Sequence, residues 1–186
     1  DIGFGPISGM WERNEDVICV CYDNEAYMNT GVQRSGATPF GARTTTSPVG
    51  KAHRGKEIFK KPIVEIAAAH QIPYAAATSI GFPGDLAARV KKAMSMKGSR
   101  FIDVLSPCVP GWGYPSERSI ELAKLAVDCG LWKMIEYEHG AFKMNYKPAQ
   151  RRPVQDYMKG QARFSHLKEE DIAKIQATVD EEWKKY

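Results

Sequence analysis

Four side chains in one short polar segment have the chemistry of a metal-binding loop. Asp23, Asn24, Glu25 and Asn29 follow directly after an apolar run, and Gly31 permits a tight backbone turn behind them. Amide or carboxylate oxygens beside an exposed backbone carbonyl form a partial shell for a hard cation, and Mg²⁺ combines a few such oxygens with ligand phosphates. The same residue types also form polar turns that satisfy their own backbone, so spacing leaves both interpretations open.

A second candidate site is the turn around Cys108, which stands between Pro107 and Pro110 and before Gly111-Trp112. A cysteine held rigidly at a strand end could ligate a metal or an iron–sulfur cluster. A cluster needs about four thiolates, however, and this segment supplies one. The alternative is a small buried residue without a ligand.

The remaining reactive side chains have no pattern of their own. Cys19 and Cys21 are spaced for one face of a strand, so we expect both to be buried, as we expect for Cys129 at a helix end. Arg43 is interpreted as an exposed loop arginine rather than a carboxylate clamp. The histidines show no ligand spacing, and no role is assigned to them.

Both candidate loops follow predicted strands of an α/β sheet. The predicted strands are 17–22, 72–80 and 100–105, the first of them buried on both faces of a parallel sheet. The predicted helices are 7–13, 57–70, 83–94 and a helix capped by Ser116 that ends before Gly130; in the second of them Pro62 is an alternative first turn. This alternation predicts a doubly wound, mostly parallel sheet, whose ligands bind at the carboxyl ends of the strands.

The last third of the chain has a different pattern. Residues 132–137 and 142–146, joined through His139-Gly140, predict a β-hairpin. Residues 147–163 are expected to be extended and basic, and 168–186 to form a charged helix with an apolar stripe. We therefore expect an α/β domain over residues 1–130, followed by a hairpin, arm and helix over 131–186 that pack on partner subunits.

Composition excludes several other classes of protein. The chain has 186 residues, 43% of them hydrophobic, and no apolar run long enough to cross a bilayer, so we expect a soluble protein. No basic run alternates with aromatic residues, and nucleic acid is not an expected partner. Four cysteines without regular spacing favour a reducing, cytoplasmic location. A formal charge of +4 suits a plain solvated surface or one that attracts anions such as coenzyme A.

Several segments together match one known family. They are Asp1-Ile-Gly3, Tyr22-Asp-Asn-Glu-Ala-Tyr-Met-Asn-Thr-Gly31, Gln33-Arg-Ser35, Ala37-Thr-Pro39, Gly50-Lys51, Ala68-Ala-His70, Ile72-Pro-Tyr74, Pro107-Cys108 and Gly111-Trp112. The chain resembles the β subunit of pyruvate:ferredoxin oxidoreductases (pyruvate synthases) and related 2-oxoacid:ferredoxin oxidoreductases. The resemblance covers essentially the whole chain, and the block from Asn24 to Thr30 is its most specific part.

The resemblance implies a thiamine-diphosphate-binding fold and an enzyme that works in a hetero-oligomer. In this family the thiamine ylide attacks the 2-oxo carbon of a substrate, which then loses carbon dioxide. Electrons pass singly through 4Fe-4S clusters to ferredoxin, and the acyl group is transferred to coenzyme A. The cofactor carries the difficult chemistry, so the protein supplies position and electrostatics.

The family's site residues are carried over position by position. Asn24 would give its side-chain oxygen and Ala26 its backbone carbonyl to Mg²⁺, and Asn29 would hydrogen-bond developing charge at the reacting centre. Cys108 would be the last of four thiolates on a 4Fe-4S cluster. The implied cofactor contacts are Asp1, Ile2 and Gly3 at a helix start, whose amides suit anions, and Asn24, Glu25, Ala26, Tyr27, Met28 and Asn29.

Other parts of the family's site do not occur in this sequence. The Gly-Asp-Gly turn with a second magnesium ligand and three further cluster cysteines should precede Asp1, and the glutamate that activates the aminopyrimidine should come from a partner chain. We therefore expect a piece of a longer chain that is inactive alone. Pyruvate is the leading substrate, with oxalate, 2-oxoglutarate, 2-oxoisovalerate and aryl pyruvates as alternatives. A non-catalytic α/β scaffold subunit is the alternative of a different class, while a nicotinamide-binding domain lacks its glycine fingerprint here.

Overall fold

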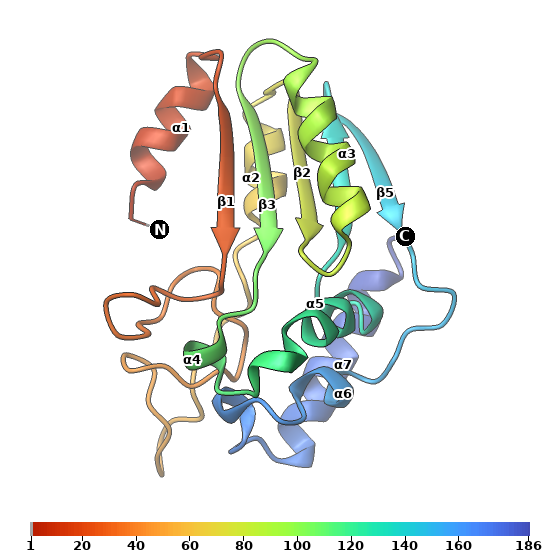
Figure 1. Ribbon diagram of the computed structural model, residues 1–186. Coiled ribbons are helices and arrows are strands. Elements are labelled where there is room, and N and C mark those ends of the chain that lie inside the picture. Colours follow the sequence, from red (N-terminus) through yellow and green to blue (C-terminus); the bar gives the residue numbers. More distant parts are fainter. Residues whose placement is uncertain (1) are drawn as a thin grey trace. The chain divides into compact units, whose positions relative to one another are not determined.

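The computed structural model describes residues 2–186 and contains helices and strands in alternation over most of the chain (Figure 1). The elements are α1 (Phe4–Glu12), β1 (Ile18–Asp23), α2 (Ile63–Ala69), β2 (Tyr74–Ser79), α3 (Pro83–Met94), β3 (Arg100–Leu105), α4 (Val109–Trp112), η1 (Ser116–Arg118), α5 (Ser119–Asp128), β4 (Met134–Glu138), β5 (Ala141–Tyr146), α6 (Val154–Met158), η2 (Ala162–Phe164) and α7 (Glu169–Trp183).

These elements form two compact units built from interleaved segments. The sheet unit contains the residues up to Asp23, Pro62–Ser106 and Lys133–Lys147. The loop–helix unit contains Asn24–Lys61, Pro107–Trp132 and Pro148–Tyr186. The division at residue 130 and the packing of residues 131–186 on partner subunits stay predictions.

The sheet unit contains a five-stranded sheet in the order β1-β3-β2-β4-β5. Its first three strands are parallel and in level register, because Ile18 and Tyr74 both pair with Arg100. The predicted hairpin forms as the antiparallel strands β4 and β5, and His139 and Gly140 turn it with φ angles of 47° and 80°. It extends the sheet from β2, a pairing that the sequence did not predict. The mostly parallel α/β sheet is thereby confirmed.

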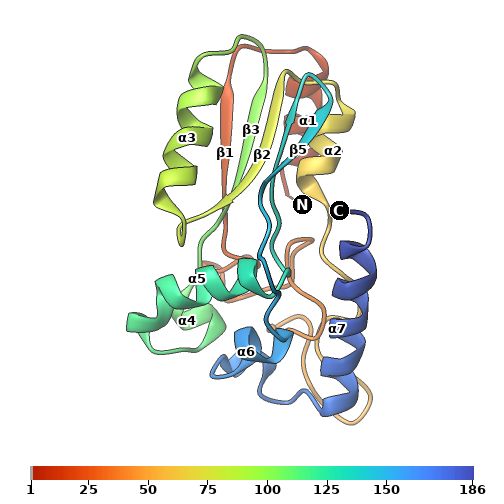
Figure 2. The same cartoon turned by 90° about the vertical axis from the view of Figure 1, so that its right-hand side faces the viewer.

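Helices cover both faces of this sheet, with α3 on one face and α1 and α2 on the other (Figure 2). Alternate strand residues point to opposite faces. Ile102 and Val104 therefore pack in the core beneath α3. Their neighbour Phe101 lies in edge contact with Trp11 of α1, with ring centroids 5.3 Å apart. This arrangement confirms the doubly wound architecture.

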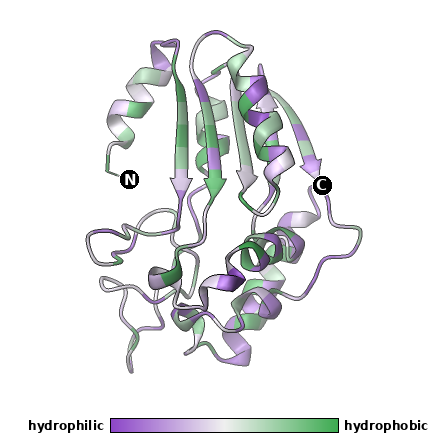
Figure 3. Cartoon of the chain, viewed as in Figure 1, coloured by the Kyte–Doolittle hydropathy of each residue, from purple (hydrophilic) through white to green (hydrophobic). Residues whose placement is uncertain are grey.

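The prediction that the first strand is buried on both faces is wrong. Val20 and Tyr22 are 54% and 68% exposed, and Cys19 and Cys21 are only half-buried. In the described sheet β1 has β3 as its one neighbour, and the crossover helix α3 lies over β2 and β3. The strands β2 and β3 are instead the ones that are buried throughout, and Figure 3 shows apolar residues along β1 as well as β3.

Several elements differ from their predicted bounds, among them α1, which begins at Phe4 rather than at 7. Helix α2 begins at Ile63 rather than at 57, because Pro62 lacks an amide hydrogen and disfavours helical backbone in the residue before it. Ser116 opens the short η1 rather than capping α5. The basic segment 147–163 is not wholly extended, since it contains α6 and η2, whose buried residues include Val154 and Phe164.

The sheet unit also contains a buried polar cluster between α3 and the hairpin. Glu136 of β4 accepts hydrogen bonds from Tyr74 over 2.7 Å and Lys92 over 3.0 Å, and it is ion-paired with Arg89. Burial of the Glu136 carboxylate raises its pKa, but the hydrogen bonds and positive charges around it outweigh that effect and lower the pKa to about 2. The cluster therefore holds an ionised carboxylate inside the sheet unit.

In the loop–helix unit, α7 packs its apolar stripe against its own chain. Polar and apolar residues alternate along α7 (Figure 3), and Ile175, Val179 and Trp183 are buried. The indole of Trp183 donates to the carbonyl of Gly130 over 2.9 Å, and a Cβ atom at Gly130 would lie 2.4 Å from that nitrogen. None of the helices within residues 2–186 has the length and apolar character needed to span a membrane.

Candidate cofactor-binding loop

The candidate metal-binding segment leaves the end of β1 and folds back on itself. Tyr27 and Gln33 form a short antiparallel pair, with N–H···O distances of 3.0 and 3.1 Å in the two directions. Between them the amide of Gly31 donates to the carbonyl of Met28 over 3.2 Å, and Gly31 has a φ of 116°. The residues from Asn24 to Gln33, called the cofactor loop below, therefore have a defined conformation.

The start of the cofactor loop is held at two successive carbonyl groups. The indole nitrogen of Trp112 donates to the carbonyl of Asn24 over 2.8 Å. The hydroxyl of Thr38 donates to the carbonyl of Glu25 over 2.7 Å. Glu25 itself adopts a left-handed backbone with φ 68°, a conformation that a non-glycine residue keeps only where its surroundings stabilise it.

The carboxylate of Glu25 is engaged inside the loop–helix unit. It is 6% exposed and ion-paired with Arg163 over 2.8 Å and Lys60 over 3.4 Å. The hydroxyl of Tyr157 lies 3.5 Å from it. The structure thus shows a buried, paired side chain at Glu25, while its contact with a cofactor stays a prediction.

The two groups predicted to ligate Mg²⁺ are among those that form no hydrogen bond within the cofactor loop. Within the described residues, neither the side chain of Asn24 nor the carbonyl of Ala26 makes a hydrogen bond. The carbonyls of Asn24, Glu25, Tyr27 and Met28 all accept one. Two ligating oxygens on either side of a fixed residue fit a cation that also binds phosphate oxygens. Asn29 is exposed, as a side chain that reaches a ligand should be.

The cofactor loop also contacts the turn that contains Cys108. A Cβ atom at Gly111 would lie 2.2 Å from Sδ of Met28 and 3.3 Å from Sγ of Cys108, so both side chains pack where glycine leaves space. Cys108 is half-buried and has a free thiol. Residues 2–186 contain no group of three or more His, Cys, Asp or Glu side chains able to hold a metal, so a cluster on Cys108 requires thiolates from elsewhere.

The predicted cofactor contacts at the start of the chain belong to the sheet unit. Asp1 lies outside the described residues. Ile2 is 88% exposed, and Gly3 takes a φ of 85° immediately before α1. Gly3 and the first turn of α1 thus have the conformation of a helix start, and the contact of all three residues with a diphosphate stays a prediction.

Three residues that organise the loop–helix unit were missed as site residues: Trp112, Arg163 and Lys56. The Lys56 ammonium is buried and donates to the carbonyls of Ser35, Gly36 and Thr38 over 3.2, 3.1 and 2.5 Å. Burial, together with nearby positive charges, lowers the pKa of Lys56 to about 8. A single lysine in a glycine-rich loop and a single arginine in a basic tail carry no sequence signal for these roles.

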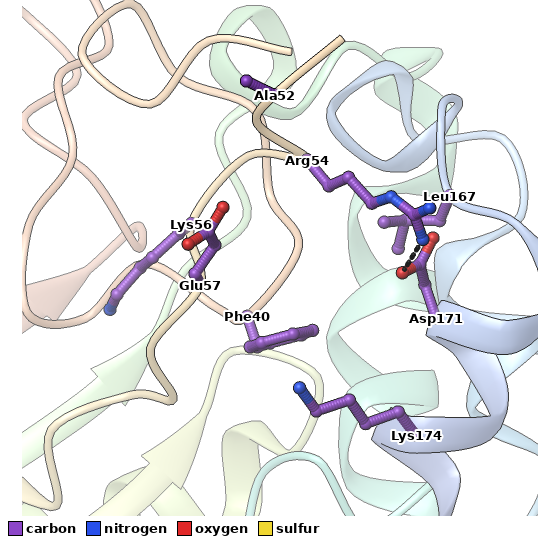
Figure 4. A pocket seen from close by; sticks show the side chains of 8 residues that line it. All are labelled: Phe40, Ala52, Arg54, Lys56, Glu57, Leu167, Asp171 and Lys174. Carbon is purple, nitrogen blue, oxygen red and sulfur yellow. Dashed lines mark hydrogen bonds and ion pairs between the residues drawn. The ribbon is translucent and has the colours of Figure 1, made fainter. Parts of the chain in front are cut away.

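The loop–helix unit contains a pocket of ≈ 400 Å³ between the segment 40–57 and α7 (Figure 4). Its positively charged groups are already engaged. Arg54 reaches across it to Asp171 over 2.9 Å, the Lys174 ammonium lies 4.6 Å from the ring of Phe40, and Lys56 points away from Phe40. No predicted site residue lines this pocket. Arg43, as expected, is exposed.

Comparison with known proteins matches this chain to one enzyme family and to subunits of 2-oxoacid oxidoreductases. Residues 2–104 match a family described as thiamine pyrophosphate enzyme, C-terminal TPP binding domain. The pyruvate synthase subunit PorB of Methanocaldococcus jannaschii is 52% identical over 99% of this chain and 62% of its own length. The ketoisovalerate oxidoreductase subunit VorB of Pyrococcus furiosus is 43% identical over 100% of this chain and 60% of its own length.

A solved structure shares the fold. The 2-oxoglutarate:ferredoxin oxidoreductase from Magnetococcus marinus matches 94% of this chain and 63% of its own chain, with a TM-score of 0.53 and 18% identity. The chain thus spans about 60% of the length of the curated relatives that it matches.

Proposed function

This chain belongs to the thiamine pyrophosphate enzymes, in the branch of the 2-oxoacid:ferredoxin oxidoreductase β subunits, and we propose that it is the cofactor-holding segment of a pyruvate synthase. The reaction would convert pyruvate, coenzyme A and two oxidised ferredoxins to acetyl-coenzyme A, carbon dioxide, two reduced ferredoxins and a proton. Other subunits would complete the enzyme, which would work in the cytoplasm, where free cysteines stay reduced.

One observation carries this proposal: the carbonyls of Asn24, Glu25, Tyr27 and Met28 in the cofactor loop accept hydrogen bonds, whereas the Asn24 side chain and the Ala26 carbonyl make none within the described residues. The Asn24 side chain and the Ala26 carbonyl would hold Mg²⁺. Thiamine diphosphate, when bound, supplies the carbon nucleophile and the electron sink for decarboxylation. The amides after Gly3 would face its diphosphate, and the exposed Asn29 amide would hydrogen-bond the reacting substrate, where charge develops. Cys108 would supply one thiolate to a 4Fe-4S cluster that takes up the electrons.

The names of the relatives favour pyruvate among the 2-oxoacids. Relatives that are 45–52% identical are pyruvate synthase subunits, whereas those named for ketoisovalerate are 43% identical. Oxalate and other 2-oxoacids are the alternatives within the same chemistry. A non-catalytic scaffold is the alternative of another class, but a scaffold has no need of a loop that keeps two cation-ligating oxygens unbonded.

The test uses the complete oxidoreductase assembly that contains this chain. Native mass spectrometry should detect one thiamine diphosphate per β subunit, and viologen reduction with coenzyme A should be fastest with pyruvate among pyruvate, 2-oxoisovalerate, 2-oxoglutarate and oxalate. Faster reduction with another 2-oxoacid would replace pyruvate as the substrate. Absence of thiamine diphosphate after incubation with the cofactor and Mg²⁺ would overturn the enzyme proposal itself.

A paired substitution tests the assigned magnesium ligand. Asn24→Ala removes the side-chain oxygen and should weaken magnesium-dependent cofactor binding at least tenfold, whereas Asn24→Asp keeps an oxygen ligand and should bind more tightly than the alanine variant. Asn145→Ala in β5 is the control, because the Asn145 side chain also makes no hydrogen bond within the described residues. Equal cofactor affinity in Asn24→Ala and wild type would remove Asn24 from the site.

A further inference from the structure

Arg163, in η2, has a buried guanidinium that contacts Glu25 of the cofactor loop and Trp112, which holds the start of that loop. It is 4% exposed and ion-paired with Glu25 over 2.8 Å. Its Cζ atom lies 3.7 Å from the ring centroid of Trp112, the residue that donates to the carbonyl of Asn24. A single side chain, that of Arg163, therefore links Trp112 to Glu25.

Further contacts hold the guanidinium in this orientation. Arg163 donates to the hydroxyl of Tyr157 over 2.8 Å and to the side-chain oxygen of Gln161 over 2.9 Å. Its backbone carbonyl accepts from the amide of Arg43 over 2.9 Å. A planar guanidinium that is stacked on an aromatic ring and hydrogen-bonded at several nitrogens loses little further entropy when it binds a carboxylate.

The position of Glu25 between the two predicted magnesium ligands makes this contact relevant to the cofactor. Glu25 stands between Asn24 and Ala26 and has the left-handed φ of 68°, so any relaxation of its backbone moves the ligating oxygens on both sides. A left-handed non-glycine residue persists only where its surroundings determine it. In this loop the surroundings are the Thr38 hydroxyl at the carbonyl and Arg163 with Lys60 at the carboxylate.

We propose that Arg163 is a positioning residue of the cofactor site, which sets the spacing of the Asn24 and Ala26 oxygens through Glu25 and Trp112. This inference rests on the proposed function. The segment after the hairpin then contributes to cofactor affinity inside its own chain, although the sequence predicts only an arm that contacts partners. Arg163 does not touch the substrate, because its guanidinium is buried and already bound.

The proposal predicts a specific pattern of cofactor affinities in the complete assembly. Arg163→Met should weaken magnesium–thiamine diphosphate binding about 10- to 100-fold, the range for residues that orient metal ligands. At saturating cofactor, kcat should stay within about threefold of wild type, since no reacting group is removed. Arg163→Lys keeps the positive charge but loses the planar contacts of the guanidinium. Its cofactor affinity should therefore lie between those of wild type and Arg163→Met.

The partner variants test whether the effect passes through Glu25. Removing one member of a buried ion pair leaves an uncompensated charge, so Glu25→Gln combined with Arg163→Met should bind the cofactor better than Arg163→Met alone. Tyr157→Phe removes one hydroxyl from the same cluster and gives a milder variant if Arg163→Met folds poorly. Equilibrium dialysis of magnesium and thiamine diphosphate supplies the affinities.

Arg151→Met is the matched control. Arg151 pairs with Asp180 over 2.5 Å and stacks on Trp183 at 5.3 Å in the same unit, but no contact joins it to the cofactor loop within the described residues. It should lower Tm without changing cofactor affinity. Wild-type cofactor affinity in both Arg163→Met and Tyr157→Phe, or equal weakening in Arg151→Met, would overturn the proposal. Absence of thiamine diphosphate from the wild-type assembly would instead refute the proposed function.

Discussion

The indole nitrogen of Trp112 lies 2.8 Å from the carbonyl oxygen of Asn24 and donates a hydrogen bond to it. The two residues are 88 positions apart in the chain. Trp112 is the last residue of the short helix that follows Cys108, and Asn24 is the first residue of the cofactor loop. The two candidate loops, which follow different strands, are therefore linked directly inside the loop–helix unit.

Trp112→Phe should destabilise the protein by about 1–2 kcal/mol, because it keeps most of the ring but leaves the Asn24 carbonyl without its donor. Cofactor affinity should fall about fivefold for the same reason. Chemical unfolding and equilibrium dialysis measure the two effects. Trp11→Phe is the control, since the buried indole nitrogen of Trp11 has no hydrogen-bond partner to lose. An equal loss of cofactor affinity in both variants would contradict this role of Trp112.

Asn29→Ala should lower kcat by about 100-fold, the effect of removing one preorganised donor that faces developing charge. The Asn29 side chain is exposed, so Tm should not change. Cofactor affinity should also stay near wild type, which separates Asn29 from Asn24. Steady-state viologen reduction at saturating thiamine diphosphate measures kcat. Thr30→Ala serves as the control on an adjacent exposed residue, and a similar decrease in its kcat would remove the special role of Asn29.

Cys108→Ala should lower the iron content of the complete assembly by about four atoms per β subunit and remove one electron paramagnetic resonance signal. Cys129→Ala is the matched control. Cys129 is buried at the end of α5, its thiol donates to the carbonyl of Pro153 over 3.1 Å, and burial raises its pKa to about 11. A buried thiol that stays protonated and is already hydrogen-bonded is not expected to ligate the cluster, so Cys129→Ala should leave the iron content unchanged. Unchanged iron in Cys108→Ala would exclude it from the cluster.

Glu136→Gln should make the free energy of unfolding depend less on pH below about pH 4.5. The folded-state pKa of Glu136 is lowered to about 2 from 4.5, so its contribution is present above about pH 4.5 and is lost as the pH falls toward 2. Wild type should lose about 2–3 kcal/mol over this range through Glu136, at about 1.4 kcal/mol per pKa unit. Urea unfolding of both proteins between pH 5 and pH 3 tests this, and parallel profiles would contradict it. At pH 7 the variant should be less stable, because Arg89 and Lys92 lose their shared carboxylate.

Much of the sheet could be predicted because its strands and turns are local features. The segments 72–80 and 100–105 form β2 and β3 at nearly the predicted positions, and His139-Gly140 turns the hairpin. The apolar pattern predicts which side chains are suited to burial, but it does not show whether another element covers them. The exposure of Val20 and Tyr22 depends on where α3 crosses, which the sequence of β1 does not contain.

By itself, the sequence determined the class of fold and the family, and it predicted the cofactor loop, because apolar periodicity and a dense local motif are features of consecutive residues. Only the tertiary structure decided how that loop is held. Glu25 belongs to the local motif. Its ion pair with Arg163, and the hydrogen bond from Trp112 to Asn24, join residues that are distant in the chain. Such contacts depend on the path of the whole backbone, so no local pattern of residues encodes them.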